Sequence, residues 1–217
     1  LNHYLVRHEQ GATHPAQRHS RVSGKPGVVF ATSGPGATNL ITGIADAQID
    51  STPMVCITGQ VHSHLLGTDA FQETDVVGIS MPVTKWNIQV TKAEDIAPAI
   101  AKAFYIATSG RPGPVLVDIT KDAQFGKTKY FYEKCESIRS YFPCPKVNEE
   151  EVSKAAELIN NAQRPYILCG HGVLLSGAEK QLLDLAEKAN IPVASTLLGL
   201  GAFPPTHELY VGYLGMH

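Results

Sequence analysis

The chain has 217 residues, of which 43% are hydrophobic and 18% are charged, a composition typical of a globular protein. Its formal net charge of -2 argues against nucleic-acid binding, which needs a basic excess. No apolar run approaches the roughly 20 residues of a membrane helix, and the first residues lack the pattern of a secretion signal, so we expect neither a membrane partner nor secretion.

Short apolar runs alternate with helical patterns over residues 1–122. Strands are predicted at residues 3–6, 28–31, 54–58, 83–88 and 115–119, and helices near residues 10–22, 37–49 and 93–108. Buried strands that alternate with helices are typical of βαβ units on a parallel sheet. We therefore predict an α/β domain with a parallel sheet at residues 1–122, truncated at its beginning.

The composition changes at residues 123–147, which are polar, aromatic and interrupted by proline, as in a linker. After it the alternation resumes, with Asn148 and Glu151 spaced as a helix capping box. Helices are predicted up to residue 161 and at 176–189, and strands at 166–169, 192–196 and from 209. Residues 148–217 are too few for a complete doubly wound domain, so we predict a partial Rossmann-like domain. Both ends stop in strand-like sequence, and we expect a fragment of a longer protein.

The four cysteines give no metal or redox pattern. Cys56 and Cys169 lie in apolar, strand-like runs, where cysteine behaves as a small hydrophobic residue. Cys135 and Cys144 flank a loop and could pair, although the rest of the sequence indicates an intracellular protein, in which disulfides are rare.

Three glycine-rich turns follow predicted strands, at residues 33–36, 170–172 and 198–201. A glycine-rich turn that leads into a helix can bind phosphate through free backbone N–H groups at the helix start. The alternative is a tight strand-to-helix turn with no ligand. Glu9 follows the first predicted strand, at the edge of a parallel sheet where ligands bind. It is either a catalytic acid or a helix-start acid that pairs with the helix dipole. Beside an apolar ring, its carboxyl would hold a proton longer than usual.

Seven segments occur in a specific order: RHEQGA at 7–12, ATSGPGATN at 31–39, ITGQV at 57–61, GTDAFQET at 67–74, GRPGPV at 110–115, TLLGLGAF at 196–203 and LGMH at 214–217. The first five resemble the pyrimidine-binding domain of the acetolactate synthase (acetohydroxyacid synthase) family of thiamine-diphosphate enzymes. The last two resemble the start of that family's central, FAD-binding domain.

The resemblance implies an enzyme that decarboxylates pyruvate on thiamine diphosphate and condenses the enamine with a second 2-keto acid, pyruvate or 2-ketobutyrate, in branched-chain amino-acid biosynthesis. Glu9 resembles the glutamate that hydrogen-bonds N1′ of the cofactor's aminopyrimidine and promotes its imino tautomer. The family's Mg2+ holds the diphosphate through a Gly-Asp-Gly…Asn segment, which this sequence lacks. We therefore expect no metal ligands here, and no activity of this chain alone.

The resemblance also assigns residues around the reaction. The positions that match the family's substrate channel are Gln60, Phe71, Gln72 and Lys121. Without a role in binding, the same residues would be loop amides, a packed aromatic ring and a solvated lysine. Positions that match FAD contacts include Arg111, whose guanidinium can fork onto a pyrophosphate. The other FAD positions are Leu197, Leu198, Gly199, Leu214, Gly215, Met216 and His217.

Partners follow from the same resemblance. The family's active site is shared with the diphosphate domain of a partner subunit, which implies a homodimer or tetramer, with a possible regulatory subunit, in the bacterial cytoplasm or a plastid. Two alternatives remain: another thiamine enzyme of the same fold group, such as a pyruvate oxidase or an acyl-CoA decarboxylase, and a non-catalytic flavin-binding or interaction module. Glu9 counts against the non-catalytic module, which has no need of an acid there.

Departures from the family pattern cluster in the predicted helix at 10–22 and after Gln60. Pro15 would cost about 3 kcal/mol if it lies beyond the first helical turn. Arg18 replaces a glycine, and we expect its bulk to conflict with the sheet. His62 and His64 stand where the family's segment borders the substrate channel, but without a third ligand nearby they do not indicate a metal site.

Overall fold

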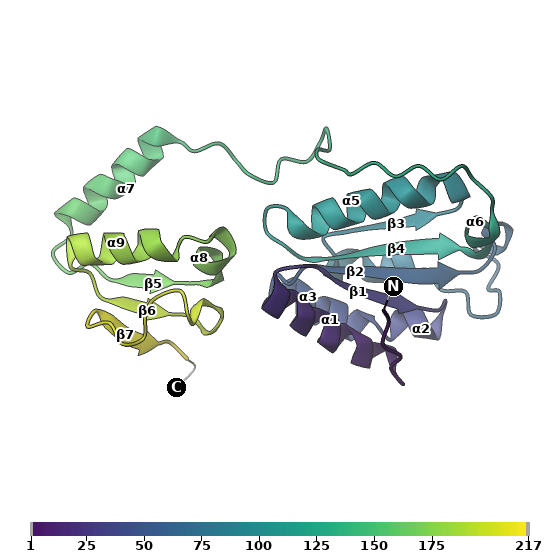
Figure 1. Cartoon of the computed structure of the whole chain (residues 1–217), viewed down its shortest axis with the longest axis horizontal. Helices are drawn as coiled ribbons and strands as arrows, with labels where there is room; N and C mark the ends of the chain where they lie inside the picture. Colours follow the sequence, from purple (N-terminus) through teal and green to yellow (C-terminus); the bar gives the residue numbers. More distant parts are fainter. Residues whose placement is uncertain (1, 216–217) are drawn as a thin grey trace. The chain divides into compact units, whose positions relative to one another are not determined.

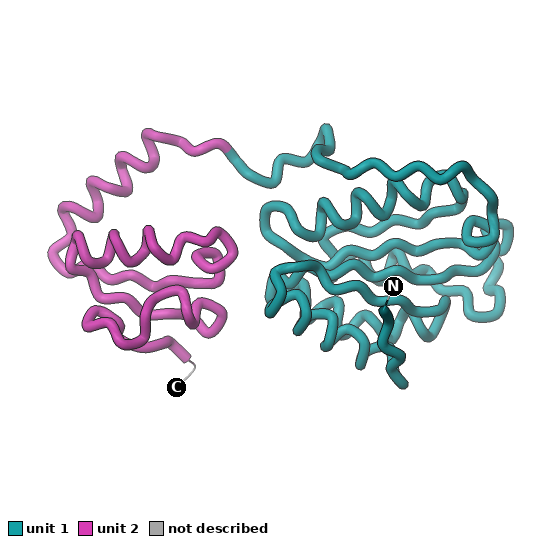
Figure 2. The backbone as a smooth tube through the Cα atoms, viewed as in Figure 1, with its two compact units in different colours: residues 1–145 teal, residues 146–217 magenta. Residues whose placement is uncertain are grey.

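The computed structural model describes residues 2–215. It separates the chain between Pro145 and Lys146 into two compact units, coloured separately in Figure 2. Each unit builds its own sheet and its own core.

The first unit is a parallel sheet with helices on both faces (Figure 1). Its strands, in the spatial order β1-β2-β4-β3, are β1 (Gly27–Ala31), β2 (Met54–Gln60), β4 (Pro114–Thr120) and β3 (Trp86–Val90). One face is covered by α1 (Glu9–Ser23) and α3 (Ile41–Ile49), and the other by α5 (Ile96–Thr108). The predicted α/β fold with a parallel sheet is confirmed.

Short elements complete this unit at the ends of the strands and the long helices. They are α2 (Pro35–Thr38), η1 (Ser63–Leu65), α4 (Val76–Ser80), η2 (Met81–Val83), η3 (Ala93–Asp95) and α6 (Lys121–Phe125).

The strand β4 lies inside the sheet, and all of its residues are buried. Leu116 packs in one core with Ile44 of α3, whereas Val115 and Val117 pack in the other core with Ala103 of α5. Successive side chains of a strand point to opposite faces, so one continuous apolar run supplies both cores.

The helix α1 packs against α3 through small and polar side chains. Gln17 Nε2 donates to the carbonyl oxygen of Gly43 at 3.0 Å. A Cβ atom at Gly43 would lie 1.8 Å from Thr13 Oγ1, so a glycine is required for this close approach.

The unusual residues of α1 lie on its solvent side. Pro15, Arg18 and His19 are exposed, whereas the buried residues of the helix are Thr13, Ala16, Gln17 and Ser20. The expected conflict between Arg18 and the sheet is therefore wrong, because the helical period turns position 18 toward solvent.

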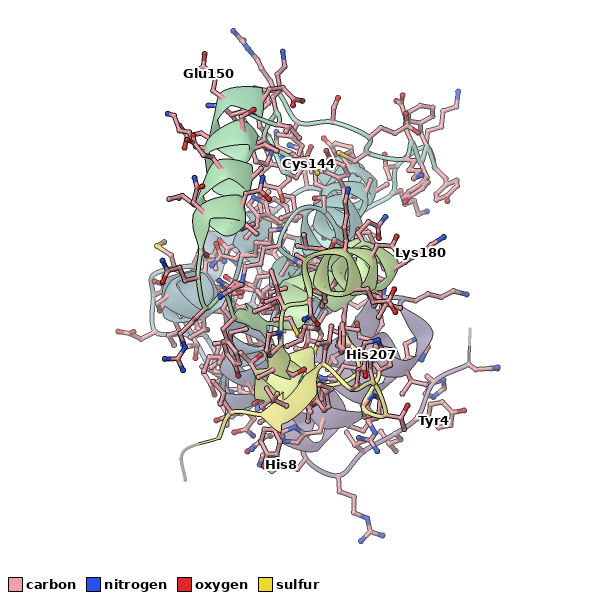
Figure 3. The ribbon with its side chains drawn as sticks, turned by 90° about the vertical axis from the view of Figure 1, so that its left-hand side faces the viewer. Tyr4, His8, Cys144, Glu150, Lys180 and His207 are labelled. Atoms are coloured by element: carbon pink, nitrogen blue, oxygen red, sulfur yellow. The ribbon has the colours of Figure 1, made fainter. Side chains whose placement is uncertain are left out.

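Some predicted elements of the first unit differ from the structure. No strand forms at residues 3–6, where Tyr4 and Leu5 are 93% and 94% exposed and pair with no strand among the described residues. Figure 3 labels Tyr4 in this segment. The predicted helix at 37–49 is broken at Asn39 and Leu40 into α2 and α3. The predicted strand at 83–88 begins only at Trp86, because a 3-10 turn that contains a proline precedes it.

The second unit is a three-stranded parallel sheet in the order β5-β6-β7. Its core contains Cys169, Ala186, Val193, Ala202 and Phe203. The elements are α7 (Glu149–Asn161), β5 (Ile167–Cys169), α8 (His171–Ser176), α9 (Glu179–Ala189), β6 (Val193–Ser195), η4 (Leu197–Gly199) and β7 (Tyr210–Tyr213).

The helix starts of this unit test the capping prediction. Asn148 Oδ1 accepts hydrogen bonds from the backbone N–H groups of Glu150 and Glu151, so the predicted cap of α7 is confirmed. The predicted helix at 176–189 begins only at Glu179, and the separate short helix α8 precedes it. Gly177, with φ of 64°, ends α8 and separates the two helices.

No helix of the part that the structure describes is both long and apolar enough to cross a membrane. All four cysteines are free, so the pairing of Cys135 with Cys144 that the sequence allowed does not occur.

Candidate functional site

The parallel topology of the first unit collects chain segments at one edge of the sheet. The turn at residues 33–36 follows β1, Gln60 ends β2, and Lys121 follows β4. Because β1, β2 and β4 are parallel neighbours, their carboxyl ends meet at the same edge. The predicted residues Gln60 and Lys121 therefore lie at one edge.

Glu9 reaches the same edge from the start of α1. Its Oε2 atom accepts a hydrogen bond from Asn39 Nδ2 at 3.0 Å. Its Oε1 atom lies 3.4 Å from the place that a Cβ atom at Gly36 would take. His8 caps the helix, since its Nδ1 accepts from Gln10 N at 3.2 Å. The segment after β1 is thus in contact with the carboxylate, and no side chain at Gly36 covers it.

The surroundings of Glu9 lower the pKa of its carboxyl group. The hydrogen bond from Asn39 is the largest cause, the backbone N–H of Glu9 adds to it, and partial burial opposes it. The raised pKa expected from the sequence applies to a carboxyl beside an apolar ring, whereas the contacts of Glu9 within this chain lower its pKa. The reason is that the groups of this chain that touch the carboxylate are hydrogen-bond donors.

The loop at residues 67–74 lies against the turn after β1. Gly34 has φ of 57°, and a Cβ atom there would lie 2.7 Å from the carbonyl oxygen of Gln72. Phe71, beside it, is 88% exposed. The structure therefore places Phe71 and Gln72 next to the segment that contacts Glu9.

Glu73 closes this loop on itself. Its carboxylate accepts hydrogen bonds from the backbone N–H groups of Gly67, Thr68 and Ala70, and these bonds lower its pKa. Asp69 and Gln72 adopt positive φ angles of 56° and 60° within the closed loop. Sequence reasoning did not single out Glu73, although it lies in the FQET segment, because its partners are backbone groups that have no sequence signature.

Gln60 is buried, and its amide is held within the chain. Nε2 donates to the carbonyl oxygen of Thr74 at 2.8 Å and to Asp118 Oδ2 at 3.1 Å. Oε1 accepts from the backbone N–H of Val61 at 2.9 Å. Gln60 therefore links β4 to the end of the loop that carries Phe71 and Gln72.

Lys121 is exposed at the start of α6, beside a hydrogen-bonded junction. The carboxylate of Asp122 accepts from the backbone N–H and from the hydroxyl of Ser63, which holds the pKa of Asp122 well below its usual value. The backbone N–H of Lys121 donates to the carbonyl oxygen of Val61 at 3.3 Å. These contacts join α6 to the segment that follows Gln60.

Arg111 lies apart from these residues. It precedes β4, so it is at the amino-terminal edge of the sheet, opposite to the edge of Glu9. Its Nε donates to Ser51 Oγ at 2.7 Å, and Ser51 precedes β2 at that same edge. The structure does not bring Arg111 together with Glu9.

The predicted FAD residues of the second unit follow its strands. Leu197, Leu198 and Gly199 form η4 after β6, and Leu214 and Gly215 follow β7, so both groups lie at the carboxyl edge of that sheet. Leu197 is 67% and Leu214 is 53% exposed. Met216 and His217 lie outside the described residues.

No group of three His, Cys, Asp or Glu side chains in residues 2–215 is arranged to hold a metal ion. His62 and His64 do lie near each other, with ring centroids 5.5 Å apart.

Comparisons with known proteins cover the whole chain. Residues 1–79 match the family model described as "Thiamine pyrophosphate enzyme, N-terminal TPP binding domain", and residues 152–217 match "Thiamine pyrophosphate enzyme, central domain". All 217 residues align with the acetolactate synthase large subunit of Corynebacterium glutamicum at 51% identity and with the acetolactate synthase of Mycobacterium leprae at 52%. The probable acetolactate synthase large subunit of Methanocaldococcus jannaschii is 50% identical. The chain spans 35% of the length of the first two relatives and 37% of the third.

Proposed function

Since the chain belongs to the thiamine pyrophosphate enzymes, we propose that it carries the pyrimidine side of the active site of an acetolactate synthase. The complete protein would decarboxylate pyruvate and join the two-carbon fragment to a second 2-keto acid, pyruvate or 2-ketobutyrate. One observation carries this proposal: Glu9 lies at the carboxyl edge of a parallel sheet, against Asn39 and Gly36.

The residues around Glu9 fit the pyrimidine ring of thiamine diphosphate. Asn39 occupies one carboxylate oxygen, and the other faces a glycine, so a ring nitrogen has an acceptor that no side chain at position 36 blocks. When bound, the cofactor supplies a carbon nucleophile that adds to the keto group of pyruvate and accepts the electron pair released with CO2. Glu9 is ionised at neutral pH, so its Oε1 can accept a proton or a hydrogen bond from a ring nitrogen, although the lowered pKa makes it a weaker base than an ordinary glutamate.

The loop beside this carboxylate is the proposed place of the 2-keto acids. Gln72 lies against the turn that contacts Glu9, Phe71 beside it is exposed, and Lys121 is exposed at the same sheet edge. A lysine ammonium attracts the carboxylate that every 2-keto acid carries. We assign these three side chains to binding of substrate rather than to the chemical step.

FAD is proposed to bind at the carboxyl edge of the second sheet. The exposed aliphatic side chains of Leu197 and Leu214 suit a flat apolar ring system. A Cβ atom at Gly199 would lie 2.5 Å from the carbonyl oxygen of Cys169, so the backbone there is already closely packed. The proposed contact of Arg111 with the pyrophosphate of FAD rests on resemblance alone, because its hydrogen-bond partner in the structure is Ser51.

Other parts of the proposed enzyme come from outside this chain. Magnesium and the diphosphate are assigned to another domain, since the chain spans about a third of its relatives' length. A homodimer or tetramer would complete the site, with a possible regulatory subunit, in a bacterial cytoplasm or a plastid.

The test is product analysis on the full-length protein that contains this sequence. With pyruvate, thiamine diphosphate, Mg2+ and FAD, it is expected to form acetolactate, whereas the 217 residues alone form none. Acetate or acetaldehyde as the only product would identify a different thiamine enzyme. Acetolactate from the 217 residues alone would show that they hold a complete site.

A further inference from the structure

Asp118 is a buried carboxylate that the proposed chemistry does not use. It lies on β4 with 0% exposure, the one fully buried Asp or Glu among residues 2–215. No lysine, arginine or histidine is among its hydrogen-bond partners in that part of the chain. Burying a carboxylate without a counter-charge is costly, so its presence here needs a reason.

Three donors surround this carboxylate, and they come from both neighbouring strands. Thr58 Oγ1 donates to Oδ1 at 2.6 Å, while Gln60 Nε2 and Gln89 Nε2 each donate to Oδ2 at 3.1 Å. Two of the donors, Thr58 and Gln89, are the residues that lie opposite Asp118 in the sheet. A cluster of donors favours an acceptor-only carboxylate, although burial raises the pKa of Asp118.

One of these donors connects Asp118 to the substrate loop. An amide that donates to a carboxylate must present its NH2 side, so Asp118 favours the orientation of the Gln60 amide that the Thr74 carbonyl and the Val61 N–H also require. The same NH2 group donates to the carbonyl oxygen of Thr74 at 2.8 Å. Thr74 ends the loop that Glu73 closes, and that loop presents Phe71 and Gln72.

We infer that Asp118 is a positioning residue for the 2-keto acid site: through Gln60 it holds the loop at residues 67–74 against the turn that contacts Glu9. This inference rests on the proposed function only for the meaning of the loop. The connection itself is a property of the chain and can be tested without the cofactor.

The test uses three variants of the full-length protein. Asp118→Asn keeps the shape of the side chain but removes its negative charge, so the bond that Gln60 donates is no longer charge-assisted. Gln60→Leu removes the connection and leaves Asp118 its other two donors. Gln89→Leu is the matched control, because it also removes one donor from Asp118 but leaves the bond from Gln60 to Thr74 intact.

The first readout is amide hydrogen exchange without cofactor. Asp118→Asn and Gln60→Leu are expected to speed exchange at residues 67–74 by about tenfold, the effect of one lost charge-assisted hydrogen bond, while Gln89→Leu leaves it near wild type. The double variant Asp118→Asn with Gln60→Leu should exchange no faster than the faster single variant, since both act on one connection.

The second readout is the kinetics of acetolactate formation. The same two variants should raise KM for pyruvate by about tenfold with a smaller change in kcat, because the loop is assigned to binding. Unchanged exchange at 67–74 in Gln60→Leu overturns the inference, even if Asp118→Asn fails to fold. A further outcome is that the variants exchange faster at residues 67–74 while the full-length wild-type protein forms no acetolactate. That result would support the loop connection and refute only the proposed function.

Discussion

The pKa of the Glu9 carboxyl is lowered mainly by one neighbouring amide. The hydrogen bond from Asn39 is the largest cause of its lowered pKa, ahead of its own backbone N–H and of His8. The same hydrogen bond stabilises the carboxylate form and makes it a weaker base, so Asn39 affects how readily Glu9 takes up the proton that the proposed chemistry gives it. Asn39 is therefore part of the candidate site, although sequence reasoning named it only as the last residue of the ATSGPGATN segment.

Replacing Asn39 with alanine should therefore raise the pKa of the Glu9 carboxyl. Since the folded-state pKa lies below the usual 4.5, Glu9 stabilises the fold above that pH and loses this contribution as the pH falls through the folded-state pKa. In Asn39→Ala, the pH-dependent stabilisation of the fold by Glu9 should be smaller. The measurement is an NMR titration of the glutamate side-chain carbons.

Glu73 serves as an internal control in the same spectrum. Its lowered pKa comes from the backbone N–H groups of Gly67 and Ala70, which the Asn39→Ala change does not touch. An unchanged or lower pKa of Glu9 in the variant would show that Asn39 is not the cause.

At the scale of single elements, α1 combines an unfavourable residue with a well-formed helix. Pro15 is the seventh residue of α1, beyond the first turn, and the helix continues through it to Ser23. The contacts of Gln17 and Ser20 with Gly43 and Pro53 hold this helix to the rest of the unit. Tertiary packing thus overrides the local preference.

Pro15→Ala should increase the free energy of unfolding by about 2 kcal/mol. The expected gain is the roughly 3 kcal/mol cost of an interior proline, less up to about 1 kcal/mol because proline also restricts the unfolded chain. Urea denaturation of the two proteins measures it. Arg18→Ala, at another exposed position of α1, should change the value by less than about 0.5 kcal/mol. Equal stability of Pro15→Ala and wild type would mean that the proline imposes no strain.

The strands that sequence predicted well are those whose signal is local. The apolar runs that became β2 and β4 are largely buried in the sheet, and β1 is an edge strand with one buried face, so composition alone marks all three. Residues 3–6 have a similar composition but no neighbouring strand among the described residues, and strand formation depends on pairing. The break at Asn39 and Leu40 was also missed, because both residues keep right-handed helical φ and ψ angles and neither is a glycine or a proline.

At the scale of the whole molecule, topology decides which candidate residues can act together. By resemblance, the sequence assigned Glu9 to thiamine diphosphate and Arg111 to FAD. It assigned Gln60, Lys121 and two residues of the 67–74 loop to the substrate channel. The parallel sheet puts all of these at its carboxyl edge except Arg111, which lies at the other edge. The sequence could predict the candidate site through resemblance, but Asp118 and Glu73 emerge only from contacts between segments that are distant in sequence or have no side-chain pattern.

We expect the 217 residues alone to be inactive, for two reasons: what the two compact units hold, and the chain's span of about a third of the relatives' length. The first unit holds the proposed proton-transfer carboxylate, and the second holds the proposed flavin edge. The diphosphate is assigned elsewhere, so experiments on turnover belong to the full-length protein.

The most direct measurement of the central claim is kcat for acetolactate formation by full-length protein with Glu9→Gln. Glutamine keeps the shape and can still accept from Asn39, but it cannot take up a proton. We expect kcat to fall at least about a hundredfold, the range of a lost acid–base group, while Glu94→Gln, an exposed acid in η3, stays near wild type. Wild-type turnover in Glu9→Gln would contradict the claim that this carboxylate moves the proton.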